Sequence, residues 1–184
     1  MGEAKLGKFE KLGRRLEREG KIINVYTEYI RTPAGREVEW VLAEHKGAAA
    51  IVAVDADGKI LLVRQYRNTA DDYVLEIPAG GLEPNEDPKE CAIRELEEET
   101  GFVAGSIEKL MHAYSTIGFC NEVIHYYLAT DLKPGKVNLD PDEYVVVERY
   151  TPEEIYEMIR RGEIVDGKTV GAVMTYLVMK NKEA

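Results

Sequence analysis

A group of glutamates around one arginine stands in the middle of the chain, in an order that can bind a divalent cation. Residues 80–102 read G-x5-E-x7-R-E-U-x-E-E-x-G-U, where U is an apolar residue. Since residues three and four positions apart share one face of a helix, Glu95, Glu98 and Glu99 are expected to lie on one surface. Their like charges repel one another, and hard carboxylate oxygens suit Mg2+ or Mn2+ better than zinc. The segment therefore predicts a metal site.

A solvated acidic helix face is the simpler alternative, in which Glu90 and Glu98 merely pair with Arg94 at four-residue spacing. The glycines, the arginine and the apolar positions of the pattern also fall in register, which favours the metal site. Because Mg2+ commonly bridges carboxylates to substrate phosphates, the expected ligand carries phosphate.

The residues around this pattern predict a helix from about Pro88 to Thr100. Asp87 can cap its start, Pro88 suits the first helical position, and Glu90 stands where a capping-box acid reaches back. Gly101 suits a left-handed stop. The helix can dock on a core through an apolar stripe of Ala92, Ile93 and Leu96.

Composition excludes some classes of function. The chain has 184 residues, with 24 Lys and Arg against 34 Asp and Glu, and the net charge of -10 disfavours nonspecific nucleic-acid binding. An anionic substrate must then be held locally, by metal and a few arginines. No apolar run approaches a membrane span and the N-terminus lacks a signal-like core, so we expect a cytoplasmic protein. Cys91 and Cys120 show no metal or redox spacing and are expected to be free thiols.

Hydrophobic periodicity predicts an α/β (α+β) protein in three parts. Residues 1–20 carry Leu6, Phe9, Leu12 and Leu16 at helical intervals, which predicts an N-terminal amphipathic helix. Residues 21–46 predict a β-hairpin with its turn at 32–35. The main domain, 47–184, is expected to hold a mixed β-sheet, with strands at 48–54, 59–66, 107–115, 123–130 and 144–150, and later helices at 153–161 and 166–180.

The pattern at 80–102 resembles the Nudix box, the signature of hydrolases that cleave a nucleoside diphosphate linked to another group X. The resemblance implies the Nudix α/β/α sandwich. It also implies that the box glutamates hold Mg2+ against a diphosphate and orient a water for in-line attack on phosphorus. Glu86 would add a metal ligand or position Arg94, whose guanidinium would fix the box glutamates.

The flanks of the box resemble the ADP-ribose pyrophosphatase group, in the segments VRQYR (63–67), LEIPAGG (75–81) and GFCNE (118–122). This resemblance implies that Arg67 meets the substrate phosphates, that Glu76 helps to hold the ligand, and that the Ala79 carbonyl completes the metal shell. Gly81 and Glu122 belong to the same matching segments and are candidate substrate-binding residues. The alternatives are that Arg67 is a surface residue, that Glu76 braces a turn, and that the glycines only make that turn.

The resemblance also implies a general base in an acidic loop before a late strand, and residues 139–144 are such a loop, with Glu143 as first choice and Asp142 and Asp140 behind it. A box glutamate could serve instead, and the loop could equally be a solvated turn. From ADP-ribose the products would be AMP and ribose 5-phosphate.

The resemblance also implies a homodimer, because in that group the early strands cross to a second subunit and help to build the adenosine pocket. Trp40, Tyr29 and Arg31 could lie near such a pocket, and packing explains Trp40 equally well. Ile117 stands where the group often has proline, so other ADP-sugars or nucleoside diphosphate sugars stay open as substrates. A non-catalytic ADP-ribose sensor is the alternative function, although such modules usually lose box carboxylates and this chain keeps them.

Overall fold

The structure, a computed structural model, describes residues 7–139 and 143–183. The described residues divide into two compact units. One comprises the chain up to Lys46 together with Tyr114–Glu122, and the other comprises Gly47–Ala113 together with the chain from Val123 onward.

In the described part of the first unit, three antiparallel strands form a sheet in the order β1-β2-β3. The strands are β1 (Glu10–Arg18), β2 (Asn24–Arg31) and β3 (Glu37–Glu44). The predicted hairpin is confirmed, with β2 and β3 in register from Asn24 opposite Glu44 to Arg31 opposite Glu37. Its turn is closed by the Gly35 N–H, which donates to the Thr32 carbonyl at 2.9 Å.

The predicted N-terminal helix is wrong, because residues 10–18 form strand β1. The charged side chains of this segment match partners across the sheet and not along a helix face. Cross-strand ion pairs of this kind stabilise strand pairing, and such tertiary contacts override a helical periodicity. The pairs are Lys11–Glu28 at 2.7 Å, Arg14–Glu44 at 2.6 Å and Arg31–Glu10 at 2.6 Å.

The second unit is built on a mixed sheet of seven strands among the described residues, in which β12-β5-β4-β10-β9 form one path. Strand β6 pairs with β5, and β7 pairs with β4. Strands β4 and β10 run parallel, whereas β4 and β5 are antiparallel. The strands are β4 (Ala48–Val54), β5 (Ile60–Arg67), β6 (Asp72–Glu76), β7 (Ala79–Gly81), β9 (Ser106–Tyr114), β10 (Val123–Thr130) and β12 (Val145–Tyr150). A separate short pair joins β8 (Phe102–Val103) to β11 (Lys133–Pro134).

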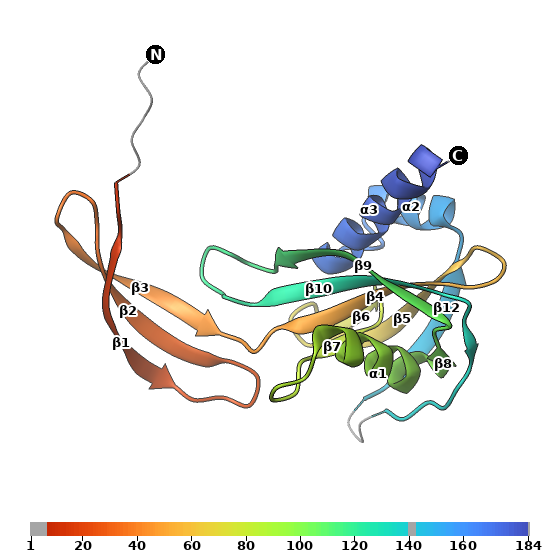
Figure 1. Ribbon diagram of the computed structural model, residues 1–184, viewed down its shortest axis with the longest axis horizontal. Helices are drawn as coiled ribbons and strands as arrows, with labels where there is room; N and C mark the ends of the chain where they lie inside the picture. Colours follow the sequence, from red (N-terminus) through yellow and green to blue (C-terminus); the bar gives the residue numbers. More distant parts are fainter. Residues whose placement is uncertain (1–6, 140–142, 184) are drawn as a thin grey trace, which may run out of the picture. The chain divides into compact units, whose positions relative to one another are not determined.

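Helices cover both faces of this sheet, as Figure 1 shows, with α1 (Pro88–Thr100) on one side and α2 (Pro152–Arg160) and α3 (Gly167–Glu183) on the other. Strand β4 is buried along its whole length, and its alternate residues serve opposite layers because successive side chains of a strand point to opposite faces. Ile51 packs in a cluster with Leu96 of α1, whereas Val52 packs in a cluster with Val173 of α3. The predicted mixed-sheet α/β/α sandwich is therefore confirmed.

The start and end of α1 confirm the helix predicted from the sequence. The Asp87 side chain accepts a hydrogen bond from the Lys89 N–H at 2.8 Å, and Pro88 is the first helical residue. Gly101 closes the helix with a left-handed φ of 70°, which a residue without a Cβ adopts at little cost. Both boundaries follow from local chemistry, so the local sequence determines where α1 begins and ends.

Neither cysteine forms a disulfide within the described residues, as predicted. Burial raises the pKa of the Cys91 thiol to about 12, so this thiol is neutral at physiological pH. Among the helices that the structure describes, none is long and apolar enough to cross a membrane.

Two valines of α3 test the packing of this helix against the sheet. Val173 is 0% exposed in the core, whereas Val178 is 51% exposed on the same helix. We expect Val173→Ala to lower the free energy of unfolding by about 1–3 kcal/mol, because it removes buried methyl groups and leaves a cavity. The same change at Val178 should stay within about 0.5 kcal/mol of the wild type. Urea denaturation of both variants measures the difference, and equal losses would mean that α3 does not pack as described.

Candidate active site

Arg94 is the centre of the charged cluster on α1. Its Nε and Nη2 atoms donate to the two carboxylate oxygens of Glu86 at 2.9 and 3.0 Å, and its Nη1 donates to Glu95 at 2.6 Å and to Glu98 at 3.0 Å. The bidentate contact from Arg94 lowers the pKa of Glu86 to about 2. Of the two roles expected for Glu86, the structure therefore supports the positioning of Arg94.

Glu95 and Glu99 lie against the backbone of the short strand β7. A Cβ built on Gly80 would lie 1.9 Å from Oε1 of Glu95, so only a glycine lets this carboxylate approach the strand. Glu99 is 5% exposed, and its Oε2 accepts a hydrogen bond from the Ala79 N–H at 3.1 Å. Burial raises the pKa of Glu95, and together with the nearby Glu95 charge it raises the pKa of Glu99 to about 8.

These carboxylates do not form a ready metal cage. Among the residues that the structure describes, no three Asp, Glu, His or Cys side chains converge as a metal centre. Glu95 and Glu98 are directed to Arg94, and Glu99 to the Ala79 backbone. The expectation that all three glutamates share one preformed pocket is thus not confirmed, because Arg94 neutralises two of them.

The residues nevertheless fit a hard divalent cation. The available donors are carboxylate oxygens, which Mg2+ and Mn2+ prefer. Gly80 lets the Glu95 carboxylate lie against β7. Glu99 is an almost completely buried carboxylate with raised pKa, which a cation would stabilise in its charged form.

Glu143 lies near this cluster, since its charge contributes to the raised pKa of both Glu95 and Glu99. This position suits its predicted role as general base. Asp140 and Asp142, the other candidates in the loop, lie outside the described residues.

A second charged cluster surrounds Glu76 at the end of β6. Arg67 donates to it in bidentate fashion, with Nε to Oε1 at 2.7 Å and Nη2 to Oε2 at 2.8 Å. The Lys168 ammonium, from the first turn of α3, also contacts Oε2. Burial alone would raise the pKa of Glu76, but Arg67 and Lys168 outweigh it and lower that pKa, so the carboxylate is ionised.

Lys168 was not among the residues predicted from the sequence. A usable signal was the order Asp166-Gly167-Lys168-Thr169, because an Asp followed three residues later by a helical N–H is an N-cap. The Thr169 N–H does donate to Oδ2 of Asp166 at 3.0 Å. That pattern predicts the helix start, but only the fold shows that Lys168 reaches Glu76.

The other two residues predicted to bind substrate, Gly81 and Glu122, belong to different units. The Gly81 carbonyl accepts a hydrogen bond from Nη2 of Arg94 at 3.3 Å, which places this glycine at the α1 cluster. Glu122 belongs to the first unit, where it lies 3.4 Å from Nδ1 of His45. In that unit Trp40 is half exposed and its ring contacts Phe9 at a centroid distance of 5.7 Å.

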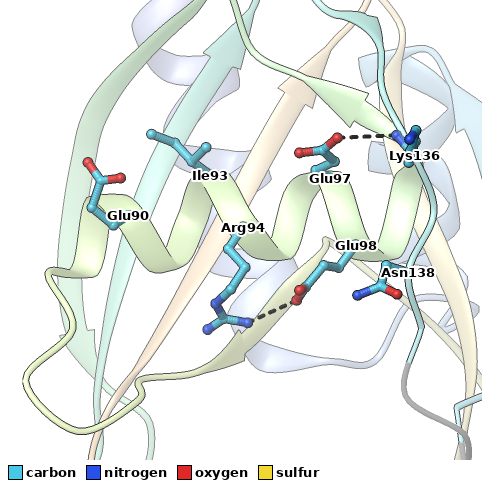
Figure 2. A pocket seen from close by; sticks show the side chains of 7 residues that line it. All are labelled: Glu90, Ile93, Arg94, Glu97, Glu98, Lys136 and Asn138. Atoms are coloured by element: carbon cyan, nitrogen blue, oxygen red, sulfur yellow. Dashed lines mark hydrogen bonds and ion pairs between the residues drawn. The ribbon is translucent and has the colours of Figure 1, made fainter.

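A hollow of about 330 Å3 runs along α1 beside the Arg94 cluster. Figure 2 shows Arg94, Glu98 and Asn138 on one side of the helix, and Glu97 with Lys136 on the other. The segment after β11 is attached to α1 here, since the Asn138 N–H donates to the Glu98 carbonyl at 3.0 Å and the Lys136 N–H to Glu97 at 3.2 Å. One wall of the hollow is therefore fixed to the helix that carries the box.

Comparison with known proteins assigns the family. The family model of the NUDIX domain matches residues 44–170. The chain is 39% identical over 163 residues to the ADP-ribose pyrophosphatase of Bacillus subtilis, covering 88% of each chain. It is 38% identical over 156 residues to the methanol dehydrogenase activator of Bacillus methanolicus, covering 84% of each. A crystal structure of an ADP compounds hydrolase shares the fold, with a TM-score of 0.87, 20% identity and 98% of both chains covered.

A mixed sheet between helices, with the complete box in and around α1, is the architecture of a Nudix domain. The protein belongs to the Nudix family, as the family match and the relatives show.

The raised pKa of Glu99 predicts a pH-dependent cost to stability. A folded-state pKa of about 8 against an ordinary value of 4.5 means that stability falls as the pH rises from about 4.5 to 8. Glutamine resembles the protonated acid and can still accept the Ala79 hydrogen bond. In buffer with EDTA, Glu99→Gln should therefore melt at a higher temperature than the wild type at pH 8, with a smaller gap at pH 5.

Glu153→Gln is the matched control, because Glu153 is an exposed carboxylate in the first turn of α2. Its melting temperature should follow that of the wild type at both pH values. If Glu99→Gln melted no higher than the wild type at pH 8, the buried and charged environment assigned to Glu99 would be wrong.

Proposed function

We propose that this protein hydrolyses the diphosphate linkage of ADP-ribose with the help of Mg2+, giving AMP and ribose 5-phosphate. The observation that carries the proposal is the complete Nudix box, residues 80–102, in which Arg94 of α1 contacts Glu86, Glu95 and Glu98 together. The similarity to the ADP-ribose pyrophosphatase of Bacillus subtilis supports ADP-ribose as the substrate.

Glu95, Glu98, Glu99 and the Ala79 carbonyl would hold Mg2+, with Mn2+ as a possible substitute. Mg2+, when bound, offsets the negative charge of the diphosphate and lowers the pKa of a coordinated water. Arg94 orients Glu95 and Glu98 through its hydrogen bonds, and Glu86 orients Arg94. Glu143 would take the proton from the attacking water, with Glu98 or another box glutamate as the alternative.

Arg67, Glu76, Gly81 and Glu122 are proposed to bind the substrate. The Arg67 side chain is 42% exposed, and its guanidinium suits phosphate oxygens because a planar fork of donors matches them. The homodimer and the cytoplasmic location stay predictions from the sequence. Another nucleoside diphosphate sugar is the second candidate substrate, since Ile117 stands where the ADP-ribose group often has proline.

The test is incubation of the purified chain with ADP-ribose and Mg2+, followed by chromatography for AMP. Glu99→Gln should lower turnover by about 100-fold or more, because a lost metal ligand removes several kcal/mol of charge stabilisation. Glu153→Gln should turn over as the wild type does. Binding of ADP-ribose without any product, across a panel of nucleotide sugars, would instead identify a sensor and contradict the proposed activity.

A further inference from the structure

Glu76 is a buried carboxylate that holds two cations of unequal accessibility. The side chain of Glu76 is 4% exposed, that of Lys168 is 14% exposed, and that of Arg67 is 42% exposed. Arg67 uses Nε and Nη2 for Glu76, so its third nitrogen, Nη1, lies outside these two hydrogen bonds. A ligand in solvent can therefore reach Arg67 more easily than Lys168.

Lys168 is fixed in place by the first turn of α3. Its ammonium lies 3.0 Å from Oδ2 of Asp166, which also accepts from the Thr169 N–H at 3.0 Å and from the Thr169 hydroxyl at 2.6 Å. The Thr169 oxygen in turn accepts from the Ile77 N–H at 2.9 Å. The helix start is thus attached to the residue that follows Glu76, and Lys168 is held against the carboxylate.

We propose that Lys168 is a positioning residue that makes Arg67 available to the substrate diphosphate. This inference rests on the proposed function and deepens it. A buried carboxylate is strongly destabilised when it loses its ion-pair partner. If Arg67 were the sole partner of Glu76, the carboxylate would therefore hold the Arg67 guanidinium tightly. With Lys168 on Oε2, Glu76 keeps an ion-pair partner when Arg67 turns part of its guanidinium toward phosphate.

The surroundings place this cluster at the α1 site. The charge of Glu99 acts on Arg67, and the charge of Lys168 acts on Glu99. The ionisable groups that face Lys168 come from three elements: Arg67 on β5, Glu76 on β6, and Glu99 on α1, with Asp166 directly before α3. A phosphate held by Arg67 would therefore lie beside the box carboxylates, where the bond is to be cleaved.

A purely structural brace is the competing explanation for Lys168. In that case its removal would lower the melting temperature but leave the KM for ADP-ribose unchanged. The two explanations also differ in their dependence on Arg67, because a positioning residue acts only while Arg67 is present.

The experiment measures kcat, KM and melting temperature for Lys168→Met with ADP-ribose and saturating Mg2+. We expect KM to rise about tenfold or more, as for a weakened charge-assisted hydrogen bond, with kcat within about threefold of the wild type. Lys168→Arg keeps the charge and should restore most of the KM. Lys180→Met is the matched control, because Lys180 is exposed in the last turn of the same helix, and its KM should not change.

A double-mutant cycle with Arg67→Met then tests whether Lys168 acts through Arg67. In the Arg67→Met background, Lys168→Met should change KM by less than about twofold. A further tenfold rise there, an unchanged KM in the single variant, or a loss confined to kcat would overturn the proposal. If Lys168→Met does not fold, Lys168→Gln replaces it, since the glutamine amide can donate a hydrogen bond to Glu76 without carrying a charge.

An assay of the wild type distinguishes a failure of this inference from a failure of the proposed function. If it forms no AMP from ADP-ribose, the proposed activity has failed, and the dissociation constant of ADP-ribose, measured in EDTA, replaces KM in the same cycle. The same tenfold weakening and the same dependence on Arg67 would support the role of Lys168, and an unchanged constant would refute it.

Discussion

The carboxylates of α1 repel one another, and the site is organised around this repulsion. Glu95 and Glu99 are drawn against β7, where burial raises the pKa of both and makes their charged forms costly. Arg94 offsets part of that charge by contacting Glu86, Glu95 and Glu98 at once. Glu99 lies outside this arrangement and has the most to gain from a bound cation.

The sandwich supplies the rigidity that this arrangement needs. The inner face of α1 packs against one face of β4 through Leu96, while the opposite face of β4 packs against α3. The strand that lines the site, β7, pairs with β4 as well. The helix α1 and the strand β7, which faces the carboxylates, are therefore both fixed to the central strand β4. Neither can move far without opening the core.

The sequence predicts those parts of the structure that rest on local chemistry. Asp87, Pro88 and Gly101 mark the ends of α1 because caps and left-handed stops are decided within a few residues. Leu12 and Leu16 fit a helical interval, but residues 10–18 form a strand because they pair with β2, and both this pairing and the ion pairs of the segment involve partners far along the chain. The role of Lys168 cannot be predicted from the sequence for the same reason, since only the packing of α3 brings Lys168 to its partner Glu76.

Anomalous X-ray diffraction from crystals grown with Mn2+ shows whether the box carboxylates bind a divalent cation. We expect an anomalous peak about 2 Å from oxygens of at least two of Glu95, Glu98 and Glu99, with the Ala79 carbonyl completing the shell. Carboxylates that remained on Arg94 and the Ala79 N–H at saturating Mn2+, with no peak between them, would contradict it.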